Sequence, residues 1–363
     1  MSWEGPGFVD HHCHLLEVAA GRPPLCGDAS DSEAVAAYHR LVSERWSTPM
    51  DEPRPPLEVH DGLRGALERA LAGAAGVGLV QLTEAGMTDW GYLEALLALR
   101  QRGPLPVRVR LLVASGIADP SRMRRTGDPW LELEGVKFYA DGWLAARTAA
   151  VRRTYRDRPG EHGILFLDAD TLARRADPFA EAGWTVATHA IGDRAVEVVL
   201  DAYERLYGSD CAGIGPRIEH AQVLAPDLVR RMAELGVRVC IQPGFGVADA
   251  GVARAALGPD ERQHAYRWDA LLDAGVRVLA GSDFPVAPLA PLAGLQCLLT
   301  GDHLDGRRAG APTLSRERAL AVTTDAGAGT VVLADDLARV AEDEVASVEV
   351  VETRPSGVLA SPP

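Results

Sequence analysis

Eight short apolar segments rich in β-branched residues alternate with segments of helical periodicity, and this alternation limits the possible folds more than any other feature of the chain. The apolar segments cover residues 7–9, 77–82, 107–113, 135–139, 185–188, 217–218, 237–241 and 276–280. Apolar residues recur every three or four positions, as in amphipathic helices, over 63–74, 92–100, 195–206, 226–235 and 266–274. Eight strands alternating with helices favour an α/β fold of the (β/α)8 TIM-like barrel type, although a doubly wound open sheet has the same alternation.

The pattern predicts one barrel domain with an insertion near its start and a tail at its end. We expect the barrel over residues 5–325, with the proline-rich stretch 15–60 forming a rim or lid that contains a short helix over 32–45. The apolar pattern weakens after about residue 301. Residues 326–363 are therefore expected to form a C-terminal tail with one isolated strand over 345–352.

Composition excludes several classes of partner. The chain of 363 residues has a net charge of -14, which argues against binding to nucleic acids or anionic membranes and favours a small-molecule substrate. Its five cysteines form no C-x-x-C pair, which indicates neither a disulfide framework nor a thiolate zinc site. No basic leader or long apolar stretch is apparent. We therefore expect a cytoplasmic protein, and homo-oligomer formation is left open.

Side chains able to bind metal lie at the ends of the predicted strands. His12 and His14 form an H-x-H pair that strand alternation places on one side, so both can bind one cation. His189 and His220 each end an apolar segment, and Asp283 follows the last one. Taken singly, each has an ordinary explanation as a core histidine, a solvated strand end or a helix cap. Their recurrence at strand ends predicts a shared site.

Lys137 interrupts an apolar strand, where an unpaired ammonium is costly. A salt bridge or a snorkelling side chain is its ordinary explanation. With the four histidines and Asp283, it completes a set of six candidate metal ligands on the first, fourth, fifth, sixth and eighth strands.

These residues and their neighbours resemble the amidohydrolase superfamily. The similar motifs are PGFVD at 6–10 running into His12 and His14, HAIGD at 189–193, IEHA at 218–221 and GSDFPV at 281–286, with further matches at 242–243 and 262–272. The closer similarity is to the family 3 branch, which includes N-substituted formamide deformylases. It runs from about residue 5 to about residue 300, in the family's order.

The resemblance implies one or two divalent metal ions at the C-terminal ends of the strands. By this similarity His12, His14 and Asp283 hold one ion, His189 and His220 hold the other, and Lys137 bridges both after carbon dioxide converts it to a carbamate. Zn²⁺ suits such ligands best, with Mn²⁺, Fe²⁺ or Co²⁺ as alternatives. A metal-bound hydroxide would attack the substrate, with Asp283 as the catalytic proton shuttle.

The expected reaction is hydrolysis of a carbon–nitrogen bond in an amide, formamide or cyclic amide. A mononuclear deaminase of this superfamily is expected to have a glutamate three residues after His189, where this chain has Gly192. Deamination is therefore disfavoured, and metal-assisted decarboxylation is a minor alternative. A non-catalytic binding scaffold is a further alternative, but the intact ligand set argues against it.

Further polar residues on or beside strand ends could shape the substrate pocket, or could equally serve packing and loop structure. They are His11, Glu84, Tyr139, Asp141, Trp143, Arg147, Gln222 and Gln242. Family members normally also have a small β-sandwich formed before and after the barrel. Here four residues precede Gly5, and the region after Thr324 lacks the usual glycine-rich segment. We therefore expect the accessory β-sandwich to be absent or reduced, with the tail as its remnant.

Overall fold

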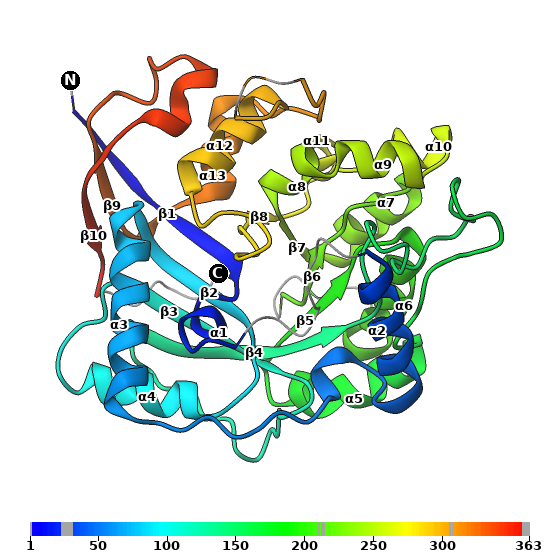
Figure 1. The fold of residues 1–363 in the computed structure, drawn as a ribbon, viewed down its shortest axis with the longest axis horizontal. Coiled ribbons are helices and arrows are strands. Elements are labelled where there is room, and N and C mark those ends of the chain that lie inside the picture. The colour runs from blue at the N-terminus through cyan, green and yellow to red at the C-terminus, as the bar shows by residue number, and fades with distance from the viewer. Residues whose placement is uncertain are drawn as a thin grey trace.

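Eight parallel strands arranged in sequence order form the framework of the protein. The computed structural model describes residues 2–22, 32–208, 211, 215–304, 306 and 308–357. The strands are β1 (Trp3–Cys13), β2 (Leu79–Met87), β3 (Arg108–Ala114), β4 (Leu131–Tyr139), β5 (Thr185–Ala190), β6 (Arg217–His220), β7 (Arg238–Ile241) and β8 (Val278–Ala280). Each pairs in parallel with the next, and helices lie outside the ring that they form (Figure 1). All eight predicted strands are present.

The last strand returns to the first through the segment that follows β8. The backbone N–H of Asp283 donates to the carbonyl of His12 at 2.7 Å, and that of His14 donates to the carbonyl of Phe284 at 2.8 Å. Gly281 permits this approach, because a Cβ there would lie 2.5 Å from the backbone nitrogen of His12. This closure confirms the predicted (β/α)8 barrel and excludes the doubly wound open sheet.

The helices include every predicted one and several others that follow the same alternation. They are α1 (Leu15–Ala19), α2 (Ser32–Arg45), α3 (Asp61–Gly76), α4 (Gly91–Arg100), α5 (Ala169–Glu181), α6 (Asp193–Tyr207), α7 (Pro226–Leu235), α8 (Pro243–Ala248), α9 (Ala250–Ala256), α10 (Pro259–Arg262), α11 (Trp268–Asp273), α12 (Pro291–Thr300) and α13 (Arg316–Thr323), with the short 3-10 helix η1 (Pro49–Asp51). Helix α5 was not predicted, although Asp168 caps it by accepting the N–H of Thr171 at 2.7 Å. No helix in the described part of the chain is long and apolar enough to cross a membrane.

The predicted insertion contains α1, α2 and η1. Helix α2 spans the predicted range, and its buried Val35 and Ala36 pack with Ala146 and Trp143 from the loop after β4. The insertion therefore lies against the end of the barrel from which that loop emerges. Its prolines at 23 and 24 fall outside the described residues.

The C-terminal region extends the sheet, which differs from the expected isolated strand. Strand β9 (Thr324–Leu333) pairs antiparallel with the first half of β1, and β10 (Val350–Pro355) pairs antiparallel with β9. Strand β10 corresponds to the predicted strand. It begins at Val350, five residues later than predicted, after the 3-10 helix η2 (Glu342–Ser347). The sheet is extended here because β1 starts at Trp3 and offers a free backbone edge beyond the barrel. The boundary expected at residue 325 falls inside β9, and in the described residues β9 and β10 are the strands that extend the sheet beyond the barrel.

Candidate metal centre

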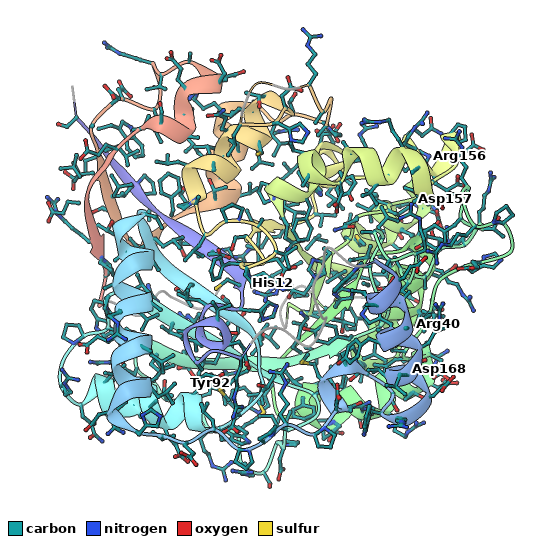
Figure 2. The ribbon with its side chains drawn as sticks, in the orientation of Figure 1. His12, Arg40, Tyr92, Arg156, Asp157 and Asp168 are labelled. Atoms are coloured by element: carbon teal, nitrogen blue, oxygen red, sulfur yellow. The ribbon has the colours of Figure 1, made fainter. Side chains whose placement is uncertain are left out.

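Five of the six candidate ligands line one cavity at the C-terminal ends of the barrel strands. The cavity has a volume of about 600 Å³, and its lining includes His12, His14, His189, His220 and Asp283. The imidazole ring centres of His12 and His220 lie 4.9 Å apart, and those of His189 and His220 lie 4.5 Å apart. Figure 2 shows His12 inside the ring of strands. The barrel thus gathers residues separated by up to 271 positions in the chain.

His12 is held in one tautomer by a buried carboxylate. Its Nδ1 lies 2.7 Å from Oε2 of Glu219, and an ionised carboxylate can only accept a hydrogen bond, so Nδ1 carries the proton. The other ring nitrogen, Nε2, then has a free lone pair. It is buried and has no hydrogen-bond partner within the described chain. A carboxylate behind a histidine with a free inner nitrogen is the usual arrangement around a metal ligand.

His220 and His189 are oriented in the same way by other acceptors. Nδ1 of His220 lies 2.7 Å from Oε1 of Gln242, and Nε2 of His189 lies 2.9 Å from the carbonyl of Gly142. The protein therefore fixes one nitrogen of each ring through an oxygen acceptor. The second nitrogen of each ring keeps its lone pair for another partner.

The free donor atoms fit a divalent transition metal. His12, His220 and Asp283 are buried, and each offers one ligand atom within 4.8 Å of the others. Oδ1 of Asp283 lies 3.3 Å from Nε2 of both His12 and His14. Two or more imidazole nitrogens with a carboxylate oxygen suit zinc, and also cobalt, iron or manganese.

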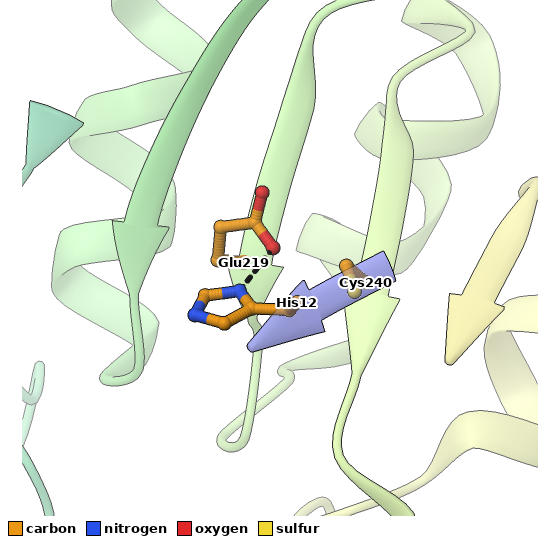
Figure 3. Close-up of side chains that lie close together, drawn as sticks. All are labelled: His12, Glu219 and Cys240. Carbon is orange, nitrogen blue, oxygen red and sulfur yellow. Dashed lines mark hydrogen bonds and ion pairs between the residues drawn. The ribbon is translucent and has the colours of Figure 1, made fainter. Parts of the chain in front are cut away.

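A second group, His12, Glu219 and Cys240, is also close enough to hold a metal ion (Figure 3). Its chemistry fits less well. One oxygen of Glu219 accepts from His12 and the other accepts from Arg217. Burial raises the pKa of the Cys240 thiol well above 9.0, so the thiolate that a metal requires is disfavoured. This group therefore supports His12 and does not form a second centre.

Arg217 anchors Glu219 inside the barrel. Both side chains are fully buried, and Arg217 also lies 3.8 Å from Glu134. Burial alone would raise the pKa of Glu219, but the charge of Arg217 and the hydrogen bond from His12 outweigh it and hold that pKa well below 4.5. Glu219 therefore stays ionised and remains an acceptor for His12.

Lys137 on β4 is fully buried and is the only lysine among the 37 lysine and arginine residues of the chain. Its Nζ lies 3.5 Å from the carbonyl of Ala85 and 4.5 Å from the centre of the Tyr139 ring. No carboxylate in the described residues forms an ion pair with it. Burial lowers its pKa from 10.5 to about 8, which raises the share of neutral amine although the ammonium is still the main form at pH 7.

Two candidate ligands have strained backbones. His220 has φ 77° and Asp283 has φ 56°, in the left-handed region that side chains other than glycine rarely adopt. Each such residue costs on the order of 1–3 kcal/mol, and these conformations are concentrated at functional sites. Both side chains line the cavity.

The weaker candidates divide into cavity residues and supporting residues. Tyr139, Asp141, Trp143 and Gln222 line the cavity. The ring of Tyr139 stacks on His189 with 5.1 Å between centres.

The carboxylate of Asp141 has mainly a structural role. It accepts backbone N–H groups of Ala150, Ile191 and Gly192, and thereby fixes the loops after β4 and β5.

The remaining weak candidates lie behind the cavity wall. Glu84 accepts the backbone N–H of Leu16 at 2.8 Å and lies 3.6 Å from Nδ1 of His14, and Gln242 supports His220 as described above. Arg147 pairs with Asp157 and donates to two carbonyls of its own loop. Burial, together with the nearby charge of Arg217, lowers the pKa of His11 to about 4.

Two cavity residues were not singled out from the sequence. His39 of α2 is buried, lines the cavity and has its Nδ1 2.8 Å from Oγ1 of Thr148. Burial lowers the pKa of His39 to about 3, so its ring is neutral. Asp249, after α8, lines another part of the same cavity. Neither residue follows a strand, so strand-end position could not reveal them.

Comparison with known proteins gives a family and a fold. A sequence model of the amidohydrolase family matches residues 24–358. His12 and His14 lie before this range, so their assignment depends on the geometry described above. Among solved structures, an uncharacterized metal-dependent hydrolase from Pyrococcus furiosus superposes with a TM-score of 0.70 at 21% identity, covering 97% of this chain and 85% of that chain. This similarity concerns the fold alone.

Curated relatives match over shorter regions. The YtcJ protein of Bacillus subtilis (strain 168) is 36% identical over 195 residues, which are 53% of this chain and 36% of YtcJ. The N-substituted formamide deformylase of Arthrobacter pascens is 34% identical over 121 residues, 33% of this chain and 22% of that enzyme. The matches therefore span about a third or less of these relatives.

Proposed function

The chain belongs to the amidohydrolase family, and from this premise we propose that it hydrolyses a carbon–nitrogen bond in a small amide, formamide or cyclic amide at a divalent metal centre. The observation that supports this most strongly is the orientation of the histidines. His12, His189 and His220 each have one nitrogen bound to an oxygen acceptor, so the second nitrogen is left for a metal. A scaffold without metal would have no need to bury Nε2 of His12 without a hydrogen bond, 3.3 Å from the carboxylate of Asp283.

In this proposal His12, His14 and Asp283 hold one ion, and His189 and His220 hold a second. When bound, zinc or a related metal supplies a water of lowered pKa and polarises the substrate carbonyl. Asp283 lines the cavity and is the candidate to accept a proton from the attacking water and to deliver it to the leaving nitrogen. Glu219 and Gln242 keep the imidazoles in position.

Lys137 is proposed to carry a carbamate that bridges the two ions. A carbamate forms when a neutral amine adds to carbon dioxide and loses a proton, which turns a potential cation into an anion. Arginine cannot replace lysine in this reaction. Of the 37 lysine and arginine residues of the chain, Lys137 is the one lysine, and it is fully buried.

Deamination is less compatible with the loop after β5. A deaminase of this superfamily would need a glutamate where this chain has Gly192. A Cβ at Gly192 would lie 1.9 Å from the carbonyl oxygen of Ala150, so the observed backbone cannot accept a side chain there. This contact favours amide hydrolysis over deamination.

We expect the protein loaded with Zn²⁺ or Mn²⁺ to hydrolyse at least one member of a panel of N-formyl amines, N-acyl amines, lactams and hydantoins. Chelation should remove the activity, and readdition of metal should restore it, because the proposed reaction needs the ion for both water and carbonyl activation. Product amine release and bound metal are measured on the same sample. A fully loaded protein that cleaves no amide would contradict the proposed function.

Replacing Lys137 with arginine or alanine should weaken metal binding by at least about 100-fold, more than loss of an outer-shell partner does. Short carboxylic acids should partly rescue the alanine variant, because they can replace the carbamate. In ¹³C-bicarbonate, the wild type should give one side-chain carbamate resonance, since the chain has one lysine. If the arginine variant binds metal normally and the wild type shows no such resonance, Lys137 is structural.

A further inference from the structure

The cavity contains a carboxylate that the proposed metal centre does not use. Asp249 lies between α8 and α9, on the β7 side of the cavity, and it is half-buried. It is not part of the group formed by His12, His220 and Asp283. The lining residues of α8 nearest to it, Phe245, Val247 and Ala248, are apolar.

The hydroxyl group that donates to Asp249 is shared with a second acceptor. The hydroxyl of Tyr266 lies 3.1 Å from Oδ2 of Asp249 and 3.3 Å from Oε1 of Gln222. Both oxygens are acceptors, and a tyrosine hydroxyl has a single proton, so it cannot satisfy both at once. The backbone N–H of Tyr266 donates to the carbonyl of Gln222 at 2.8 Å, so the two residues are also joined through the main chain.

No cation compensates the charge of Asp249. Within the part of the chain that the structure describes, no arginine, lysine or histidine forms an ion pair with it. Burial raises its pKa from 3.8 to about 6, and only the hydrogen bond from Tyr266 opposes this. At neutral pH the group is therefore ionised but incompletely paired, which is an unfavourable state unless a ligand completes it.

Away from the proposed metal centre, the same cavity offers little to a substrate anion. Among the described lining residues Arg54 is the one arginine, and its Nη1 already contacts Oε2 of Glu17 at 3.2 Å. A substrate carboxylate would thus meet Asp249 without an uncommitted cation to bind it. The Asp249 carboxylate would therefore repel anionic substrates as well as attract cationic ones, and both effects contribute to specificity.

We propose that Asp249, positioned by Tyr266, is a specificity subsite for a protonated amine of the substrate. That the substrate also contains an amide follows from the proposed function, on which this part of the inference rests. The substrate class is then a small amide with a basic amino group beyond the bond that is cleaved, and N-acyl amino acids and other acids are disfavoured. An ammonium donating to Asp249 forms a charge-assisted hydrogen bond in a partly apolar wall, where such a bond is strong.

The test compares probes that differ only in their terminal group. N-(ω-aminoalkyl)ureas with three to six methylenes, the alkylureas with a methyl group in place of the amine, and the corresponding ω-ureido acids are titrated calorimetrically into the metal-loaded protein. We expect at least one amine probe to bind about tenfold or more tightly than its methyl analogue, and the acids to bind most weakly. If no chain length shows a preference for the amine, the proposal is overturned.

Variants of Asp249 test whether this residue causes the preference for amine probes. Asp249→Asn should remove the amine preference but leave the affinity for the methyl probes within about twofold, whereas Asp249→Glu should retain part of it because the charge remains. Asp343→Asn is the matched control, since it makes the same change in net charge at an exposed position on η2. An unchanged amine preference in a folded Asp249→Asn protein would contradict the assignment.

Binding of the ureas does not require turnover, so the two proposals can fail separately. The matched formamides are then used as substrates. Amine preference in binding without hydrolysis of any formamide would overturn the proposed function and keep the subsite. Hydrolysis of amine, methyl and acid formamides with equal kcat/KM would keep the function and overturn the subsite.

Discussion

The Asp283→Asn variant is expected to lose about 10²- to 10⁴-fold in kcat while KM changes little. Asparagine has nearly the same shape as aspartate and retains one oxygen, but its amide cannot accept and return a proton at neutral pH. A group that acts in proton transfer contributes mainly in the transition state, so its loss lowers the rate more than it weakens substrate binding. Steady-state kinetics with the best substrate of the amide panel provides the measurement.

Because Asp283 is also a candidate ligand, bound metal must be measured on the same Asp283→Asn sample. Asp343→Asn serves again as the control for net charge, since its side chain is exposed on η2. A variant that retains metal and loses turnover supports the proton-transfer role. A variant with full metal content and near-normal kcat would exclude that role and leave Asp283 as a ligand alone.

The barrel could be predicted from the sequence because its signal is local. Each strand is a short apolar run, and each of the named helices has its own periodicity. Strand β9 was missed for the opposite reason. It contains four residues with little apolar character, Thr324 to Gly327, and it exists because the distant first half of β1 offers it a backbone edge. Pairing over more than 300 positions leaves no local pattern in the chain.

The candidate metal ligands could be predicted from the sequence only where the regular alternation of side chains along a strand holds. His12 and His14 lie two positions apart, and both line the cavity as alternation requires. Glu219 precedes His220, so alternation directs it to the opposite side from that histidine. The positive φ of His220 breaks the regular strand there, and both residues come to serve one centre. A single backbone angle therefore hid the partner of His12 from the sequence.

Asp249 and His39 show a further limit of sequence reasoning. Neither belongs to a motif, and each is brought to the cavity by a helical segment that packs over the barrel end. Loops and insertions on a rigid barrel usually determine which substrate is accepted. The family could be recognised from strand ends, whereas the residues proposed to select the substrate required the three-dimensional arrangement.

The largest effect on stability is expected from Glu219→Ala. It leaves the buried Arg217 without its closest partner and leaves Nδ1 of His12 without an acceptor. Breaking a buried ion pair in this way costs about 3–5 kcal/mol in the free energy of unfolding. Loss of the group that orients His12, a proposed metal ligand, should also weaken metal affinity by about 10- to 100-fold. Chemical unfolding of the metal-free protein and titration with a competing chelator measure the two effects.

A double variant separates these two consequences of removing Glu219. In Arg217→Met with Glu219→Leu, no buried charge of the pair is left unpaired, and apolar side chains of similar volume often restore the stability of such a pair. His12 still lacks its acceptor, so we expect most of the unfolding free energy to return while metal affinity stays low. If the double variant binds metal as tightly as the wild type, Glu219 serves only to neutralise Arg217. If both quantities remain low, packing around β6 has been lost, and the isosteric Glu219→Gln variant becomes the decisive measurement. The glutamine side chain of that variant would keep an oxygen near Nδ1 of His12 without the charge, so reduced metal affinity in a stable protein would identify the charge of Glu219 as what positions His12.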